Sequence, residues 1–151
     1  MRKAAALFVL LAIAGLTTAY YATGSSAEES GRTIRVFEKE TAFETLDLGV
    51  KGESSGDQEF FTSDLFRMKS DGTQGAKIGK LVGSCTTSIG GLGECKGTFL
   101  LKQGQILGAV VLDNTGPVFT AAIVGGTGAY REARGEVVFN KNKGVDTIRI
   151  F

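Results

Sequence analysis

Residues 125–128 contain three glycines and separate two apolar runs, at 118–124 and 137–139. Glycine has no Cβ, so its backbone adopts positive φ angles or approaches another element where a side chain would clash. The pattern predicts a strand, a tight bend, a short irregular crossing that carries Tyr130 and two arginines, and a second strand. Glycine-rich turns between apolar runs are typical of chains built from short strands.

The composition agrees with such a fold. The chain has 151 residues, enough for one domain, with 22 glycines and a single proline. Its 17 basic and 16 acidic residues form no basic stripe, so nucleic acid is not an expected partner. The absence of histidine excludes a Ser-His-Asp triad and a His-ligated metal, and two cysteines alone cannot make a tetrahedral zinc site. We expect neither a cofactor nor a metal.

Residues 1–27 have the layout of a secretory signal peptide. Two basic residues follow the initiating Met, an apolar stretch occupies 4–16, and small residues suitable for cleavage lie at 17–19 and 25–27. The apolar stretch is short for a membrane-spanning helix, which needs about 20 residues, and an uncleaved anchor is the alternative. We therefore expect a secreted, extracellular domain at 33–151 that keeps no contact with a membrane after cleavage.

Runs of β-branched and aromatic residues between turn residues predict seven or eight strands. They lie at 33–39, 59–66, 77–88, 94–102, 105–112, 118–124, 137–139 and 147–151. Residues 41–48 extend the first strand or begin another, and a helix at 38–46 is an alternative that no capping residue supports. The spacing favours a sandwich or a closed antiparallel barrel, in which the last strand pairs with the first and removes the free edge.

Two of the predicted strands, at 106–112 and 118–124, are apolar nearly throughout. Strands of this kind are buried on both faces. One face fills the interior of a small barrel, and the other face needs a cover, most simply a second subunit. We expect an oligomer.

The two cysteines flank the glycine-rich turn at 90–93 symmetrically. If Leu81 faces Phe99 across this hairpin, Cys85 faces Cys95 closely enough for a disulfide. An exported chain permits such a bond. The alternative is a free, reactive Cys85 in a pocket.

The sequence Gly-Gly-Thr-Gly-x-Tyr-Arg-x-Ala-Arg-Gly at 125–135 resembles the signature of the dirigent proteins and of the related allene oxide cyclases. Residues 61–66 are similar to the cyclases' Phe-Thr-x-x-Leu-Tyr, and residues 79–85 to their strand motif ending in Gly-x-Cys. The resemblance covers about 33–151. It implies an eight-stranded antiparallel β-barrel, usually a homotrimer, with an apolar cavity at one mouth.

The resemblance also implies a function. Allene oxide cyclases convert an unstable fatty-acid epoxide into a cyclopentenone, and dirigent proteins steer phenolic radical coupling or the cyclisation of a quinone methide. Both kinds of protein supply a shaped cavity and a few polar groups that stabilise developing charge.

Where a motif position matches, the functional residue of the cyclases or dirigent proteins implies a site residue in this chain. Glu38 matches the cyclase glutamate that stabilises positive charge, and Ser63 stands where the cyclases have an asparagine. The resemblance predicts catalytic residues Glu38, Asp64 and Arg134 and ligand-binding residues Phe61, Ser63, Tyr130 and Arg131. The alternatives are an outward-facing Glu38, a solvated Asp64 and arginines that only fix the bend through hydrogen bonds to loop carbonyls.

Together these observations favour an exported dirigent-like or allene oxide cyclase-like barrel. It binds a small, largely apolar molecule and either steers its cyclisation or coupling or simply carries it. The alternative is a non-catalytic scaffold whose interior is filled by side chains. An open interior that an acid or an arginine faces would favour the first interpretation, and a filled interior with charges only outside would favour the second.

Overall fold

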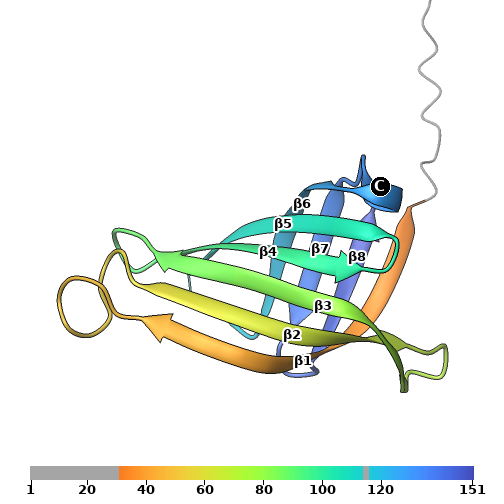
Figure 1. The fold of residues 1–151 in the computed structure, drawn as a ribbon, viewed down its shortest axis with the longest axis horizontal. Helices are drawn as coiled ribbons and strands as arrows, with labels where there is room; N and C mark the ends of the chain where they lie inside the picture. Colours follow the sequence, from red (N-terminus) through yellow and green to blue (C-terminus); the bar gives the residue numbers. More distant parts are fainter. Residues whose placement is uncertain (1–30, 114–115) are drawn as a thin grey trace, which may run out of the picture.

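A computed structural model describes residues 31–113 and 116–151 of the chain. Eight antiparallel strands, each paired with its neighbours in chain order, form a closed barrel (Figure 1). The strands are β1 (Arg32–Leu46), β2 (Gln58–Met68), β3 (Gln74–Thr87), β4 (Gly93–Leu101), β5 (Gly104–Leu112), β6 (Val118–Gly126), β7 (Gly135–Asn140) and β8 (Val145–Ile150). The predicted all-β, eight-stranded antiparallel β-barrel is confirmed, whereas the predicted signal peptide lies outside the described residues.

The last strand closes the sheet against the first. The pairing of β8 with β1 runs in register from Arg32 opposite Ile150 to Phe37 opposite Val145. Over this length β8 also pairs with β7, and β1 pairs with β2 from Val36 onward. The expected seal between the two ends of the domain is therefore present. Within the described ranges, no helix is long and apolar enough to cross a membrane.

The first strand continues into residues 41–48, which the sequence assigned either to this strand or to a new one. β1 runs without a helix from Arg32 to Leu46, and its pairing with β2 shifts between Glu40 and Ala42. This bulge at Thr41 changes which side chains face inward, so that Phe43 pairs with the inward-facing Phe61. At one side of the barrel, β1, β2 and β3 project beyond the shorter strands (Figure 1).

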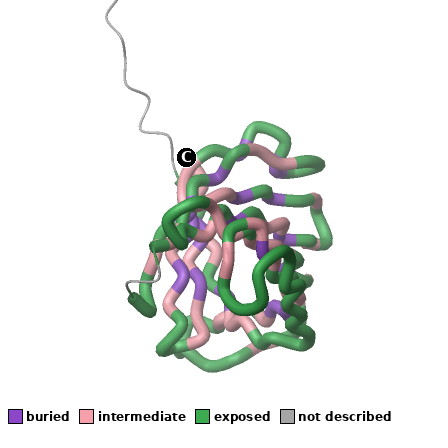
Figure 2. Tube along the Cα trace, turned by 90° about the vertical axis from the view of Figure 1, so that its left-hand side faces the viewer, coloured by how far each residue is buried: buried purple, intermediate pink, exposed green. Residues whose placement is uncertain are grey.

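Alternating side chains from all eight strands face the interior. Buried positions alternate with exposed ones along the strands (Figure 2), as the two-residue period of a strand requires. The most deeply buried apolar side chains are Val36, Leu65, Leu81, Phe99, Ile106, Val137 and Ile148. They make one core that spans the barrel from β1 to β8.

The glycine bend adopts the predicted geometry. A single 3-10 turn, η1 (Gly128–Tyr130), crosses from β6 to β7 and contributes the buried Tyr130 to the core. Gly128 has a φ of 60°, and a Cβ there would lie 2.4 Å from the carbonyl oxygen of Gln103. The bend is therefore pressed against the β4–β5 turn, where Ala129 N donates a 2.9 Å hydrogen bond to the same carbonyl.

The outer face of the barrel keeps several uncovered apolar side chains. Val111 on β5 and Val124 on β6 are 61% and 62% exposed. They belong to the two strands whose sequences are apolar on both faces. The structure describes a single chain and therefore does not test the expected oligomer. Both the oligomer and the homotrimer that the resemblance implies remain predictions.

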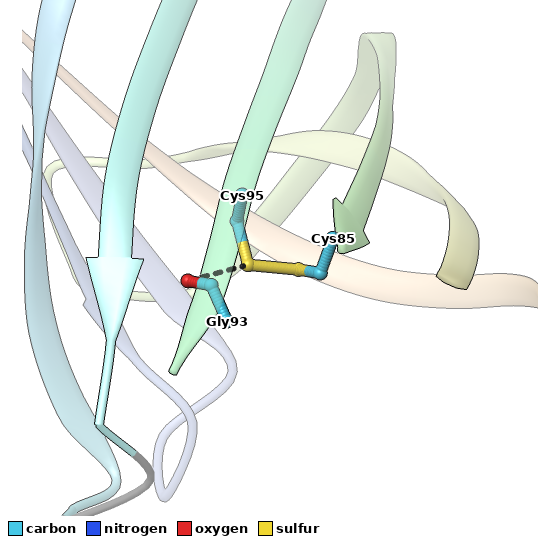
Figure 3. Close-up of a disulfide and its surroundings, with 3 residues drawn as sticks. All are labelled: Cys85, Gly93 and Cys95. Atoms are coloured by element: carbon cyan, nitrogen blue, oxygen red, sulfur yellow. Dashed lines mark hydrogen bonds between the residues drawn. A yellow bond between two sulfur atoms is a disulfide. The ribbon is translucent and has the colours of Figure 1, made fainter. Parts of the chain in front are cut away.

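The disulfide between Cys85 and Cys95 joins β3 to β4 (Figure 3). Leu81 lies opposite Phe99 in the same hairpin, which confirms the register that predicts the bond. Cys95 Sγ also lies 3.8 Å from the carbonyl oxygen of Gly93. A disulfide sulfur has no proton to donate, so this is a packing contact.

Reduction of this disulfide should destabilise the barrel. The bond joins residues 10 apart in sequence. The chain-entropy model for so short a loop gives a loss of roughly 3 kcal/mol in the free energy of unfolding. Thermal denaturation with and without dithiothreitol measures this loss, and a C85S/C95S variant should melt at the same temperature in both conditions. An unchanged melting temperature of the wild-type protein on full reduction would contradict the expectation.

Candidate functional site

A cavity of about 190 Å³ opens at the end of the barrel that carries the β1–β2, β3–β4 and β7–β8 turns. The side chains around it are mainly apolar and include Phe61, Leu81, Phe99, Val110, Phe119 and Phe139. The disulfide forms part of the wall. The opposite end, where Tyr130 lies, contributes nothing to this lining.

Three aromatic rings form one wall of the cavity. The rings of Phe119 and Phe139 stack with centroids 4.8 Å apart and an interplanar angle of 17°. Phe99 stacks on Phe139 with centroids 6.1 Å apart. Rings held nearly parallel present flat faces, and flat faces pack well against other flat, apolar molecules.

Lys141 connects this wall to a buried polar group. Its Nζ lies 5.9 Å from the ring centroids of both Phe119 and Phe139, within the range of a cation–π contact. The same Nζ is 3.7 Å from Oε2 of Glu38. Lys141 lines the cavity, whereas the Glu38 side chain, only 9% exposed, lies behind it.

Glu38 belongs to a cluster of three polar side chains inside the barrel, of which the other two are fully buried. Ser63 Oγ donates a 2.7 Å hydrogen bond to Oε1 of Glu38. Asp146, 1% exposed, is the third member. We call Glu38 and Asp146 the acid pair.

Burial raises the pKa of Asp146 to about 8, and the negative charge of Glu38 adds to the effect. With both carboxyls ionised, Asp146 Oδ2 has no hydrogen-bond partner among the described residues. A proton on Asp146 corrects this deficit, because the neutral acid can then donate a hydrogen bond to Glu38. Near neutral pH the acid pair therefore holds one proton in an otherwise apolar interior.

The acid pair forms because of the β1–β8 seam. Val36 faces inward on β1, so Glu38 two residues later also faces inward. Asp146 lies directly opposite Val36 across the seam, and the inward-facing Ile148 follows it on β8. Two acids far apart in sequence thus meet inside the barrel only when the sheet closes.

The cavity lining carries charged groups of both signs, since Lys96 and Lys141 lie there with two acids. Glu40 and Glu59 line its rim. Asp57 fixes the neighbouring β1–β2 loop by accepting hydrogen bonds from the backbone N–H groups of Leu48, at 2.8 Å, and Ser54, at 2.6 Å. These bonds, led by the one from Leu48, lower the pKa of Asp57.

The structure brings together only some of the predicted site residues. Glu38, Ser63 and Phe61 lie on the inner face of the barrel, with Phe61 in the cavity wall. The alternative of an outward-facing Glu38 is therefore wrong, and the catalytic and ligand-binding roles of the three residues stay predictions.

Asp64 is placed differently from the pocket acid that the resemblance implies. It follows the inward-facing Ser63 by one residue, so its side chain points outward. There it pairs with Lys77 at 2.7 Å and Lys80 at 3.6 Å. The hydrogen bond from Lys77 lowers the pKa of Asp64.

Tyr130, Arg131 and Arg134 lie at the opposite end of the barrel from the cavity. Tyr130 is buried beneath the guanidinium of Arg32, whose Cζ is 5.3 Å from the ring centroid. Arg131 and Arg134 are exposed. None of the three lines the cavity, because β6 and β7 turn at η1 on the far side of the core.

Two residues at the site were missed from the sequence: Asp146 and Lys141. The sequence does contain a sign of Asp146, because residues two apart on a strand face the same side of the sheet. Asp146 therefore faces the interior together with the apolar Ile148. Lys141 gives no such signal, since it lies in a turn where parity does not apply.

The pH dependence of stability tests the protonation of Asp146. The folded protein keeps the proton up to about pH 8, whereas the unfolded chain loses it near 3.8. The folded state therefore binds more protons between these values, and the stability that this group contributes falls as pH rises. A D146N variant removes the titration, so its stability relative to wild type should rise between about pH 5 and pH 8, by at most about 1.4 kcal/mol per pH unit.

Urea denaturation across this pH range measures the difference. D64N is the matched control: Asp64 is already ionised in both states over the range, so its difference from wild type should stay flat. A flat difference for D146N as well would show that Asp146 titrates normally.

Comparison with known proteins supports the fold. No protein-family model and no curated protein sequence matches the chain. Among solved structures, a pyocyanin demethylase is 26% identical with a TM-score of 0.63, over 80% of this chain and 98% of that one. The exo-specific intermolecular Diels-Alderase AbnU is 17% identical with a TM-score of 0.57, over 80% and 98%.

A third solved structure, the pterocarpan synthase dirigent protein GePTS1, is 19% identical with a TM-score of 0.53, over 80% of this chain and 82% of that one. The chain therefore has the dirigent and allene oxide cyclase-like barrel fold that its motifs imply.

Proposed function

We propose that this protein is an exported barrel that binds a small, flat, largely apolar molecule in the cavity and steers its reaction by positioning. The observation that carries the proposal is the acid pair behind Lys141, beside an open apolar cavity. A filled scaffold has no use for a buried acid that keeps its proton at neutral pH, because such an acid costs stability. The open cavity likewise favours ligand binding over the scaffold alternative.

The size and shape of the cavity limit the ligand. Its volume of about 190 Å³ is below the roughly 300–1,000 Å³ of sites for drug-sized ligands. The ligand is therefore compact or leaves part of its surface at the mouth near Phe43. The stacked rings of Phe119 and Phe139 favour an aromatic or conjugated ligand.

The polar side chains supply charge at one edge of the bound ligand. The Lys141 ammonium, which lines the cavity on a side chain that is 54% exposed, stabilises an oxygen on which negative charge develops. Glu38, held by Ser63, fixes Lys141 and balances its charge. Asp146 acts through Glu38 as a positioning residue, because the shared proton keeps the acid pair singly charged.

The comparisons support a reaction on a small molecule. Proteins with this barrel are named as a demethylase, a Diels-Alderase and a pterocarpan synthase. These names describe three different reactions, so they support a shaped cavity for small molecules rather than one chemistry.

Export and assembly belong to the same proposal. The disulfide and the signal-like residues 1–27 support secretion. The uncovered apolar side chains of β5 and β6 support an oligomer, with a trimer as the form that the resemblance implies.

A variant that fills the cavity tests the proposal. Ala121 faces the cavity from β6, and its neighbour Ala122 is exposed on the outer face of the same strand. We expect A121F to weaken the binding of 2-naphthol, a compact flat probe, by at least about tenfold, since the new ring occupies the cavity. A122F adds the same ring outside and should bind like wild type.

Fluorescence titration of 2-naphthol measures both affinities, and circular dichroism confirms that both variants are folded. Equal binding by A121F and wild type would place the probe elsewhere and overturn the proposed site. An absence of binding to wild type would favour the scaffold interpretation.

A further inference from the structure

Charge is distributed unevenly between the two ends of the barrel. Acids outnumber bases around the cavity mouth: Glu40, Asp47, Glu53, Asp57 and Glu59 line the cavity and the adjoining recess, against Lys96 and Lys141. A groove at the opposite end is lined by five cationic side chains, Arg32, Arg35, Arg67, Lys77 and Lys102, and by no acidic one. The whole sequence, with 17 basic and 16 acidic residues, gives no indication of this uneven distribution.

The groove is a substantial feature of the fold. It has a volume of about 650 Å³ and lies between the start of β1, the end of β2, the start of β3 and the β4–β5 turn. Apolar side chains and the Tyr130 ring form part of its surface, and Thr33 and Gln103 add polar groups. No residue lines both the groove and the cavity, so the two are separate sites.

Most of the groove's cations lack an acidic partner. Lys77 pairs with Asp64 at 2.7 Å, and the Arg32 guanidinium lies over the Tyr130 ring. Within residues 31–113 and 116–151, Arg35, Arg67 and Lys102 form no salt bridge. Like charges gathered without counterions repel one another and attract anions.

We propose that this groove binds a multivalent oxyanion, a molecule that carries several phosphate or carboxylate groups. Guanidinium groups bind such groups through paired, charge-assisted hydrogen bonds, and three of the five cations are arginines. Lys102 adds a point charge at the β4–β5 turn. Because four separate segments contribute the cations, the groove suits an anion with several charged groups.

Calorimetric titration with tripolyphosphate tests the proposal. We expect saturable binding that weakens as the salt concentration rises, because the screening length shortens from about 30 Å at 0.01 M to about 10 Å at 0.1 M. R67Q should weaken binding by about fivefold or more, since it removes an unpaired groove cation. R131Q removes the same charge from an exposed site outside the groove and should change the affinity by less than about twofold.

A charge-reversal variant, K102E, provides a second test at an exposed turn where the fold tolerates change. It should weaken binding more than R67Q does. A parallel titration with citrate shows which anionic group the groove prefers. Tighter binding of tripolyphosphate identifies a phosphate ligand, and tighter binding of citrate identifies a carboxylate ligand. Equal losses in R67Q and R131Q, or no binding of either anion to wild type, would overturn the proposal.

Discussion

Backbone hydrogen bonds between β1 and β8 close the sheet, and this closure gives the alternating side chains of all eight strands a common interior. The same seam places Asp146 opposite Val36 and therefore beside Glu38. One pairing thus creates both the barrel and its most unusual chemical feature. A carboxyl buried there is tolerable only as a neutral acid, which is why Asp146 retains a proton that an exposed aspartate would lose.

Local details then shape the cavity within that closed interior. The bulge at Thr41 turns Phe43 toward the mouth. Gly83 leaves room for the Phe61 ring, which lies where a Cβ at that position would be. The disulfide holds β3 and β4 together beside the opening. The interior is therefore packed at the end near Tyr130 and open at the other, with acids outnumbering lysines at the open end and five cations in the groove at the packed end.

The sequence predicts features that depend on neighbours along the chain. Strand positions follow from alternation and glycine turns, and the Cys85–Cys95 bond follows from the register of a single hairpin. Glu38, Ser63 and Phe61 followed from motifs, and strand parity now explains why they face inward whereas Asp64 does not. The contact between Glu38 and Asp146 requires the closing seam, and the cationic groove requires four separate segments. Neither is visible in any local stretch of sequence.

The protonation of Asp146 in the folded protein is the most direct test of this account. Carbon-detected NMR of the side-chain carboxyls, followed from acidic to alkaline pH, reports each aspartate separately. The structure predicts that the Asp146 carboxyl titrates near pH 8 while Asp57 and Asp64 titrate below the ordinary aspartate value. An Asp146 carboxyl that titrates together with exposed aspartates would mean that the acid is solvated and that the seam does not bury it beside Glu38.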